Sequence, residues 1–458
     1  MNAIAHNNIA DRLNRMVKLA MDTGEAASVE DAERLFAGYR LAVAAGADVG
    51  RSPTLQAALL TIVNAGRRCL LGGIEVAGIA DMTLLVPVPP FETLEQAVTG
   101  LGGRVVDAVS PDAPLVVLGD VEEWSGHPFA VRATFDGWAG GIVPLGQSAM
   151  RMGERHEFTL AGVLAGALAV TEAFQFLRGN QPAAGRREAG LSLWRPELHW
   201  QDSAASGPVI DRLPAALWLI GLGNLGQAYL WTLGLLPYAA PGDVQLVLQD
   251  FDVLAPSNES TSLLTGRSLV GRRKTRAMAD WAERRGFRTA IIERPFGPNV
   301  KIRNDEPPLA LCGVDNALAR SALEDVGFGR VIEAGLGGGP SDFLGFRTHG
   351  FPGVRKARDV WNPCSESFEQ RVDLPAYRTL AAAGLDRCGL VQLAGRTVGA
   401  PFVGAVAAAA VVGEALRVVN GAHCYDLIDG HLRDLAHRTA VPAQDRAPFN
   451  PGSTVAGD

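Results

Sequence analysis

The sequence predicts an α/β protein made of two related halves, and three observations lead to this prediction. A glycine-rich turn follows the apolar run at 217–220 and precedes a helical pattern. Two long apolar segments rich in small residues, 158–179 and 401–421, share the same spacing of glycine and glutamate. The strand-like segments PLVVLG at 114–119 and PLALCG at 308–313 also resemble each other. Because both pairs occur in the same order, they indicate an internal repeat.

The composition limits the class of protein. The chain has 458 residues, of which 47% are hydrophobic, so two or three domains with sizeable cores are expected. A formal net charge of −7 argues against a nucleic-acid binder with a broad basic face. Residues 1–20 contain no apolar signal core, and the apolar run at 401–412 is shorter than the roughly 20 residues that span a bilayer. We therefore expect a cytoplasmic protein without a membrane segment.

The first half begins with a polar stretch, 1–25, that is expected to be mobile or loosely helical. Helices are predicted at 28–43 and at 53–66, the second with Ser52 as its cap. Short strands are expected near 70–76, 83–88, 115–118 and 141–144. This half has no clear GxGxxG turn and no acid pair at a strand end, so it is expected to have kept the fold and lost a nucleotide site.

The spacing of the repeated segments predicts the domain boundaries. About 48 more residues separate Gly313 from Gly404 than separate Gly119 from Gly162. Long insertions of this kind are usually functional. The predicted division is listed from the N-terminus: a first domain at 26–180, a linker at 181–213, a second domain at 214–430 with an insertion at about 345–395, and a flexible tail at 437–458.

The strongest local motif is the glycine turn of the second half. Gly221, Gly223 and Gly226 have GxGxxG spacing, and Asp250 ends the next predicted strand. Strand, glycine turn, helix, strand and acid form the first unit of a Rossmann-like fold. The second glycine lets backbone N–H groups approach a phosphate, and the helix N-terminus adds partial positive charge. Asp250 can accept a hydrogen bond from a ribose hydroxyl, although an NAD site would have the same pattern.

The motifs that follow resemble the ThiF/MoeB/ubiquitin-activating superfamily over residues 214–425. In order they are the acid pair Asp250/Asp252, Ser257/Asn258, Gly271/Lys274, and Asp315/Asn316/Arg320, followed by the closing helix at 404–421. The small-residue run before that helix is most similar to the activating enzymes of bacterial ubiquitin-like conjugation (Bil-type) operons, which are linked to antiphage defence. The resemblance implies two ThiF-type domains fused as an intramolecular pseudo-dimer, with self-association possible.

The resemblance also implies a reaction. Members of the superfamily adenylate a C-terminal carboxylate with ATP and release pyrophosphate, so charge that builds on phosphoryl oxygens needs preplaced cations. Asp250 would hold the ribose, Lys274 and Asn258 would hold phosphate oxygens, and Asp315 would hold Mg²⁺. The remaining candidate nucleotide contacts are Gly221, Gly223, Gly226, Asn224, Asp252, Arg267 and Arg320.

One departure from the family pattern stands out. The family usually has an arginine three residues after the asparagine, and here that position is Thr261. Arg267 or an arginine of the first half are the candidates for the missing cation. Plainer interpretations also exist: Asp250 and Asn258 as turn residues, Asp315 as a helix cap, Lys274 as part of a solvated basic face, and Arg320 as a local ion-pair partner.

The cysteines bear on whether the predicted enzyme would form a thioester after adenylation. None of the five forms a CxxC pair, so no structural zinc is expected and reduced thiols are favoured. By resemblance, a cysteine between the metal aspartate and the closing helix would form a thioester with a ubiquitin-like protein that ends in glycine and pass it to a conjugating enzyme. Cys388 is the first candidate and Cys364 the second, while Cys312 is expected to pack in the core. Arg387 and a helix N-terminus are expected to lower the pKa of Cys388.

Two other functions fit the same pattern. One is a sulfur-carrier adenylyltransferase that stops before thioester transfer. The other is a non-catalytic scaffold that binds ATP or NAD, for which Thr261 is the best support. In the latter case neither Cys388 nor Cys364 would react, and both would only fill space.

Overall fold

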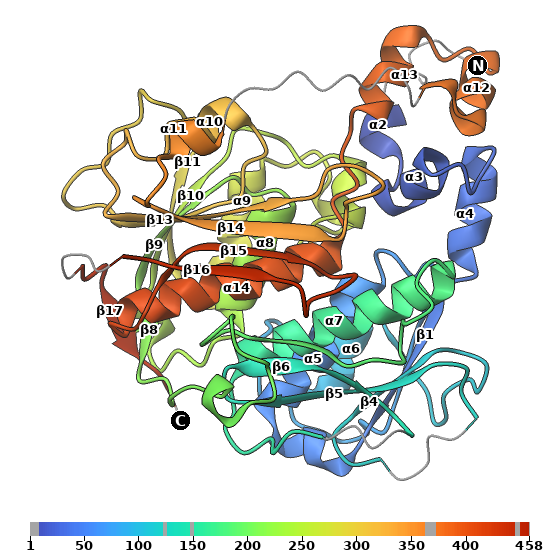
Figure 1. The fold of residues 1–458 in the computed structure, drawn as a ribbon, viewed down its shortest axis with the longest axis horizontal. Helices are drawn as coiled ribbons and strands as arrows, with labels where there is room; N and C mark the ends of the chain where they lie inside the picture. Colours follow the sequence, from blue (N-terminus) through green and yellow to red (C-terminus); the bar gives the residue numbers. More distant parts are fainter. Residues whose placement is uncertain (1–8, 122–125, 147–150, 362–371, 445–448, 458) are drawn as a thin grey trace.

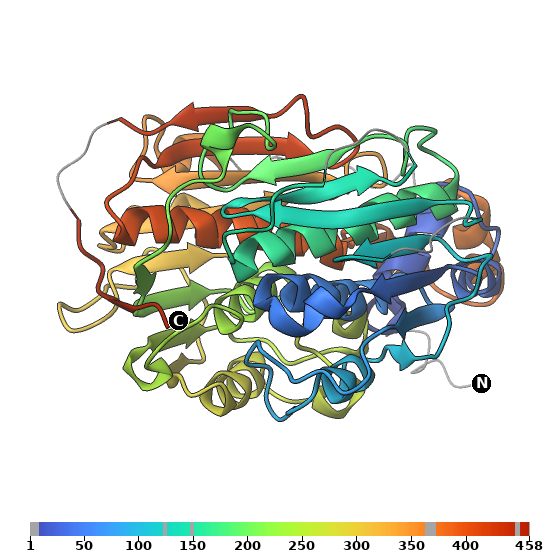
Figure 2. The ribbon, with the colours of Figure 1, turned by 90° about the horizontal axis from the view of Figure 1, so that it is seen from below.

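The computed structural model describes residues 9–121, 126–146, 151–361, 372–444 and 449–457. Two β-sheets form the outer layers, and long helices lie between them (Figure 1). This mixed α/β architecture with parallel sheets agrees with the predicted fold class. Figure 2 views the same layers from the side of the first sheet, whose strands (teal) lie in front.

The first sheet has seven strands in the order β3-β2-β1-β4-β5-β6-β7. Neighbours from β3 to β5 are parallel, and β6 and β7 are antiparallel to the strands beside them. The strands are β1 (Arg40–Ala45), β2 (Gly73–Ala77), β3 (Arg104–Val105), β4 (Leu115–Leu118), β5 (Ala130–Asp136), β6 (Ala139–Pro144) and β7 (Ala189–Ser192).

The second sheet repeats this order and adds one strand: β11-β10-β9-β12-β13-β14-β15-β16. Here too the first five strands, from β11 to β13, are parallel, and the pairs from β13 to β16 are antiparallel. The strands are β9 (Ala216–Ile220), β10 (Gln245–Gln249), β11 (Arg288–Ile292), β12 (Leu309–Cys312), β13 (Arg330–Leu336), β14 (Gly345–Phe351), β15 (Tyr425–His431) and β16 (Thr439–Pro442). A separate pair joins β8 (Arg212–Pro214) to β17 (Ser453–Val455).

The helices follow the same repeat. In the first half they are α2 (Ile9–Arg12), α3 (Arg15–Asp22), α4 (Val29–Ala37), α5 (Pro53–Gly66), α6 (Leu94–Gly100) and α7 (Thr159–Arg178). In the second half they are α8 (Asn224–Gly234), α9 (Lys274–Arg284), α10 (Ala317–Ser321), α11 (Ala357–Val360), α12 (Pro375–Ala382), α13 (Arg387–Ala394) and α14 (Pro401–Val419). The similar sequence segments thus occupy equivalent places, with β4 matching β12 and α7 matching α14.

Helices α7 and α14 pack against each other in the middle of the molecule. Small residues allow α7 to approach α5 closely, because a side chain on Gly162 would collide with the carbonyl group of Thr54. Both helices are long and apolar enough by composition to cross a membrane, yet 89% of each apolar window is buried within the protein. Their apolar character is therefore explained by packing between the sheets.

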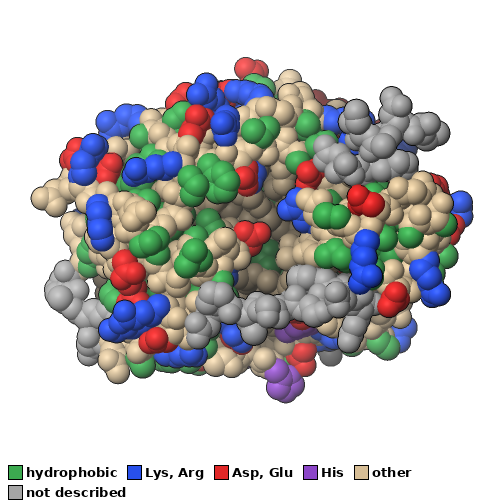
Figure 3. Space-filling view, turned by 90° about the horizontal axis from the view of Figure 1, so that it is seen from above, with side chains coloured by type: hydrophobic (Ala, Val, Ile, Leu, Met, Phe, Trp, Pro, Cys, Tyr) green, Lys and Arg blue, Asp and Glu red, His purple; other side chains and the backbone are tan. Residues whose placement is uncertain are grey.

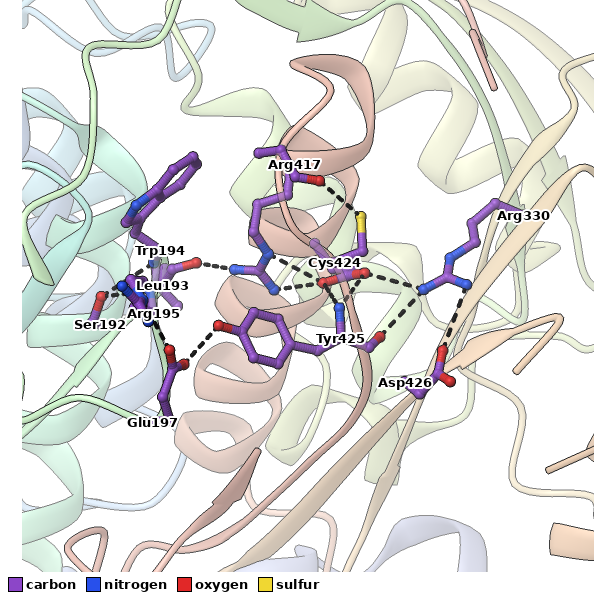
Figure 4. Close-up of polar contacts among 12 residues, drawn as sticks. Ser192, Leu193, Trp194, Arg195, Glu197, Arg330, Arg417, Cys424, Tyr425 and Asp426 are labelled. Atoms are coloured by element: carbon purple, nitrogen blue, oxygen red, sulfur yellow. Dashed lines mark hydrogen bonds and ion pairs between the residues drawn. The ribbon is translucent and has the colours of Figure 1, made fainter. Parts of the chain in front are cut away.

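A buried polar network ties the C-terminal end of α14 to the first half (Figure 4). The Arg417 guanidinium pairs with Glu414 and donates a hydrogen bond to the carbonyl oxygen of Leu193. Glu414 also accepts from the backbone N–H of Tyr425 at 3.0 Å and from Arg330 at 3.2 Å. Because buried charges are costly unless they are paired, this network favours one arrangement of the two sheets.

Several elements differ from the sequence expectations. The helix predicted at 28–43 ends at Ala37, and the central strand β1 follows. Residues 83–88 form only an isolated bridge at Thr83. The predicted insertion begins later than 345, because β14 belongs to the sheet. The expected flexible tail contains β16 and β17, both paired with other strands.

The N-terminal segment differs most from expectation. Residues 9–22, expected to be mobile or loosely helical, form α2 and α3, whose apolar side chains are buried. These two helices pack against α13 and α12 of the insertion. The Tyr377 hydroxyl donates to Asp22 at 2.5 Å, and Asp22 pairs with Lys18 in a contact from which solvent is fully excluded. Helices α2 and α3 and helices α12 and α13 therefore form one small lobe, which lies at the upper right of Figure 1.

Candidate functional site

A cleft of about 1300 Å³ opens at the carboxyl ends of β9, β10 and β12. This edge is where ligands bind in open parallel sheets, because strand order reverses there and loops diverge. Figure 3 shows a hollow between the larger body on the left and a smaller lobe on the right. Most of the predicted site residues line the cleft: Gly221, Gly223, Asn224, Asp250, Asp252, Asn258, Lys274, Asp315 and Arg320.

The glycine turn has the geometry that its spacing predicts. Gly221 has a φ of +83°, in the region that favours glycine. A side chain on Gly226 would collide with the carbonyl oxygen of Gly221, so helix α8 can pack this closely only with glycine. A Cβ on Gly223 would meet open space, and this residue starts α8 without a side-chain cap. No side chain of the described residues caps the backbone N–H groups in the first turn of α8. Free N–H groups at the start of a helix can bind an anion.

The acid pair and the lysine form a charged group beside this turn. Asp250 is buried, and its carboxylate accepts from the N–H of Leu222 at 2.7 Å and from the N–H of Asp252 at 2.8 Å. The Lys274 Nζ lies 2.7 Å from Asp252 and 3.8 Å from Asp250. Asp250 therefore fixes the backbone of the glycine turn as well as facing the cleft. Lys274 is held at the first position of α9, where it is mostly buried, so a solvated basic face does not describe it.

In the loop after β12, the neighbouring residues Asp315 and Asn316 have different roles. Asn316, and not Asp315, caps α10, because its side chain accepts from the N–H of Ala319 at 3.0 Å. The exposed Asp315 carboxylate has no partner among the described residues and faces the cleft. Arg320 is buried and donates to the carbonyl oxygens of Val314 and Ala334. Arg320 thus holds the Asp315 loop against β13, and its guanidinium is occupied by the protein itself.

The loop that carries Ser257 and Asn258 also lines the cleft. Asn258 lines the cleft within the short helix η4 (Pro256–Ser260), and its side chain accepts from the N–H of Ala255 at 2.8 Å. Thr261, at the position of the missing family arginine, is buried. The side chain of Arg267 is 93% exposed, pairs with Glu259 at 3.6 Å, and is not among the residues that line the cleft. The structure therefore does not bring the predicted substitute cation Arg267 to the site.

An arginine that the sequence did not single out lies in this position instead. Arg15, at the start of α3, lines the cleft and is only 9% exposed. Its backbone N–H donates to the Ser260 hydroxyl at 3.0 Å, and its Nη2 lies 3.5 Å from the Ser257 hydroxyl. Its Nη1 has no hydrogen-bond partner among the described residues. Burial, and next the nearby Arg396, lower the pKa of Arg15 to about 10. An anion in the cleft would satisfy this group.

Comparison with known proteins places the chain in a family. A family model described as the BilD C-terminal domain matches residues 213–422, and one described as the BilD N-terminal domain matches residues 40–193. The chain belongs to the BilD family. It is 47% identical over 424 residues to the Bacterial E1-like protein BilD of Collimonas sp. (strain OK412), and the match covers 92% of each chain. The resemblance to Bil-type proteins that the motifs predict is therefore supported.

Two solved structures share parts of the fold. TcdA, the E. coli tRNA N6-threonylcarbamoyladenosine dehydratase, is 16% identical and overlaps 44% of this chain and 85% of its own, with a TM-score of 0.28. PaaA is also 16% identical and overlaps 50% of this chain and 65% of its own, with a TM-score of 0.32. At these identities and TM-scores the likeness carries no argument about function.

In this BilD-family chain the first half also fixes the loop that carries Asn258. The fully buried guanidinium of Arg68, from the end of α5, donates to the carbonyl oxygens of Glu259, Leu263 and Thr265. It also donates to the Asn64 side chain at 3.1 Å. Three backbone groups of the loop therefore depend on one side chain of the other half. Sequence spacing gave no signal for this role, because the contacts span up to 197 residues.

We expect Arg68→Met to destabilise the protein by about 3 kcal/mol or more, because it leaves three buried carbonyl groups without donors. Urea unfolding measures this change. Arg67→Met is the matched control, since the side chain of Arg67 is partly exposed and its ion pair with Glu259 is 4.0 Å long. The control should lose less than about 1 kcal/mol. Equal losses in both variants would show that Arg68 is an ordinary interface residue.

The candidate nucleophiles differ in their surroundings. Cys388 is exposed on the first turn of α13, in the small lobe, and is not among the residues that line the cleft. The Asp386 carboxylate caps this helix by accepting from the N–H of Gly389 at 2.7 Å. Cys364 lies outside the described residues. Cys312 is buried on β12, where burial raises its pKa to about 12, as expected for a packing residue.

Proposed function

We propose that this chain uses ATP to adenylate the C-terminal glycine of a ubiquitin-like protein. The observation that carries the proposal is convergence: the glycine turn, Asp250, Lys274, Asp315 and Arg15 all face one cleft from separate elements. A triphosphate needs several donors and cations fixed before charge develops on it. The membership of the BilD family, whose named relative is E1-like, supports the same reaction.

Each part of ATP has a matching group. The open backbone at Gly223 and the start of α8 suit phosphate oxygens, and Lys274 and Arg15 supply positive charge. Asp250 would accept from a ribose hydroxyl. Asp315 fits Mg²⁺, since this ion usually keeps several waters and takes one or two carboxylates together with substrate phosphates. No group of three or more metal-binding side chains is found among the described residues, so a closed structural zinc site is not proposed there.

The cleft is larger than a nucleotide requires and extends over the end of β13. Gly335 and Gly337 line this extension together with Leu336. An extended peptide end that must bring its carboxylate to the α-phosphate would lie along this part of the cleft. Attack of that carboxylate on the α-phosphorus forms the acyl-phosphate bond and breaks the bond to pyrophosphate, which leaves.

A second step is proposed on the insertion. A cysteine thiolate, of Cys388 or Cys364, would attack the acyl carbon, form a thioester and release AMP, and the acyl group would then pass to a conjugating enzyme. Exposure of Cys388 in a lobe that packs on the N-terminal helices supports this assignment. A role in bacterial ubiquitin-like conjugation in the cytoplasm, within antiphage defence, follows from the same proposal.

We further propose that the two halves form an intramolecular pseudo-dimer whose first half binds no nucleotide. The equal strand order of the two sheets supports the pairing. In the first half the N-terminus of α5 is already occupied, because the Glu157 carboxylate accepts from the N–H of Thr54 and from the Ser52 hydroxyl, both at 3.0 Å. Asp48 and Glu154 line the same pocket of about 190 Å³. Arg151 pairs with both Asp48 and Glu154, so protein groups already satisfy the charges at this pocket.

The test is ATP–pyrophosphate exchange with a ubiquitin-like protein that has a free C-terminal glycine. We expect exchange by the natural chain, and a decrease of about 100-fold or more in Asp315→Asn. Asp305→Asn is the control, since the side chain of Asp305 is 76% exposed and does not line the cleft. Absence of exchange in the natural chain, with ATP bound, would favour the non-catalytic scaffold.

A further inference from the structure

A buried carboxylate on β13 lies close to Arg320, the residue that holds the Asp315 loop. Glu333 is fully buried and is not among the residues that line the cleft. Its Oε1 accepts from the Nδ1 of His349 at 2.5 Å and from the indole N–H of Trp361 at 3.2 Å. Its Oε2 has no hydrogen-bond partner among the described residues and lies 3.6 Å from the Nε of Arg320. Two donors therefore hold one oxygen, and the other oxygen lies beside the arginine.

Glu333 supplies the negative charge that pairs with Arg320. The Arg320 guanidinium is buried, and the carbonyl oxygens of Val314 and Ala334 that accept its hydrogen bonds carry no net charge. The centre of the Trp361 ring lies 4.3 Å from the guanidinium carbon and adds a cation–π contact. A buried cation is costly unless an anion pairs with it, so the position of Arg320 depends on the charge of Glu333.

The hydrogen bonds of Arg320 connect this pair to the candidate metal ligand. Val314, which accepts from the Nε of Arg320, immediately precedes Asp315. The Nη2 of Arg320 donates to Ala334 on β13 at 2.9 Å. The guanidinium thus joins the Asp315 loop to the sheet. Because Mg²⁺ requires near-ideal octahedral geometry, a small displacement of Asp315 would weaken its hold on the ion.

We propose that Glu333 is a positioning residue for the Mg²⁺ that Asp315 holds. The inference rests on the proposed function, which gives Asp315 this role. Glu333 acts through the charge of Arg320, and His349 and Trp361 fix the orientation of its carboxylate. Groups that orient metal ligands typically contribute about 10- to 100-fold to metal affinity. Loss of the Glu333 charge should therefore weaken the Mg²⁺-dependent binding of ATP and spare the binding that needs no metal.

Calorimetry measures the gain in ATP affinity that Mg²⁺ brings, with Mg²⁺–ATP, ATP in EDTA and AMP as separate probes. Glu333→Gln keeps the shape and removes the charge, so we expect the gain to fall by about tenfold or more, with ATP in EDTA and AMP bound as in the natural chain. Asp315→Asn should show the same pattern, because it removes the ligand itself. Glu333→Asp should recover part of the gain, since it restores the charge. Glu324→Gln is the matched control, because the Glu324 carboxylate accepts from the N–H of Ala357 at 2.6 Å and does not line the cleft.

Two further variants show whether Glu333 acts through Arg320. In an Arg320→Met background, Glu333→Gln should cause no additional loss of the gain, because the group on which it acts is already absent. His349→Phe keeps a ring beside Phe351, whose centre lies 5.8 Å from that of His349. It removes one donor to the Glu333 carboxylate, so we expect a smaller loss of the gain, about three- to fivefold. This variant carries the test if Glu333→Gln does not fold.

Four outcomes would overturn the inference. Equal weakening of ATP and AMP in Glu333→Gln would mean that the residue only supports the fold. An unchanged gain in Glu333→Gln, or in His349→Phe where that variant carries the test, would separate the carboxylate from the metal. Additional loss in the Arg320→Met background would mean that Glu333 does not act through the arginine. A natural chain without any gain from Mg²⁺ would also contradict it. The proposed function fails separately, when Mg²⁺ strengthens ATP binding by the natural chain but no ATP–pyrophosphate exchange follows.

Discussion

Cys388→Ala is expected to keep ATP–pyrophosphate exchange at the level of the natural chain and to lose the thioester completely. Adenylation uses groups in the cleft, and Cys388 does not line it. The thioester step instead needs a sulfur atom that can reach the acyl-adenylate and ionise. Mixing the variant with ATP and a ubiquitin-like protein, followed by electrophoresis with and without a thiol reductant, measures the adduct directly.

The other described cysteines are poor nucleophiles, which supports the expectation that Cys388→Ala loses the thioester. Cys69 and Cys312 are fully buried, and burial raises the pKa of both thiols. Cys424 lies mostly buried beside Glu414 in the network of Figure 4, and burial raises its pKa to about 12. Cys424→Ala is therefore the control and should keep the thioester. A thioester retained in Cys388→Ala would move the assignment to Cys364, and no adduct in the natural chain would favour a sulfur-carrier adenylyltransferase.

The sequence predicted the glycine turn and its neighbours well because their geometry is local. Gly221 and Gly226 are needed for a positive φ and a close backbone contact within six residues of each other. Asp250 follows the next strand in a parallel sheet, so the fold brings it to the same edge. The two long apolar helices were also predicted nearly to the residue, because each is a long apolar run and a glycine, Gly179 or Gly421, follows its last residue within two positions.

The first half was harder to predict because its strands are buried on both faces. β1 follows α4 directly, and its apolar residues show no alternation, so the segment 28–43 looked like one helix. Gly38, which follows the last residue of α4, was the signal that separates them. The turn after β1 carries Asp48, whose carboxylate accepts from the N–H of Asp120 at 2.8 Å.

The N-terminal residues, expected to be mobile or loosely helical, are more ordered than predicted for a different reason. Asn14 caps α3 by accepting from the N–H groups of Met16 and Val17, and the apolar residues that follow were a recognisable helix signal. What no pattern could give was the partner of Arg15, since Ser257 lies 242 residues away. When one half supplies a cation to the other, no motif of fixed spacing in the sequence marks it. Only the three-dimensional contact identifies such a residue.

That contact leads to the second large effect: Arg15→Met is expected to lower the rate of ATP–pyrophosphate exchange by about 100- to 1000-fold. Arg15 lines the cleft close to Ser257 and Ser260, near the position where the family has its arginine, and its Nη1 has no hydrogen-bond partner among the described residues. Charge on the leaving pyrophosphate would then develop without its cation. Exchange measured at saturating ATP separates this loss from weaker binding.

The same substitution must be distinguished from damage to the helix that carries it. The contact between Arg15 and Ser260 uses a backbone N–H group, which methionine keeps, so α3 should remain docked. Arg15→Lys should recover part of the rate, because it restores the charge without the second donor. Arg12→Met, an exposed arginine of α2, should behave like the natural chain. Normal exchange in Arg15→Met would leave Lys274 as the main cation of the cleft and would imply that the first half supplies only a rigid support for the loop at Asn258.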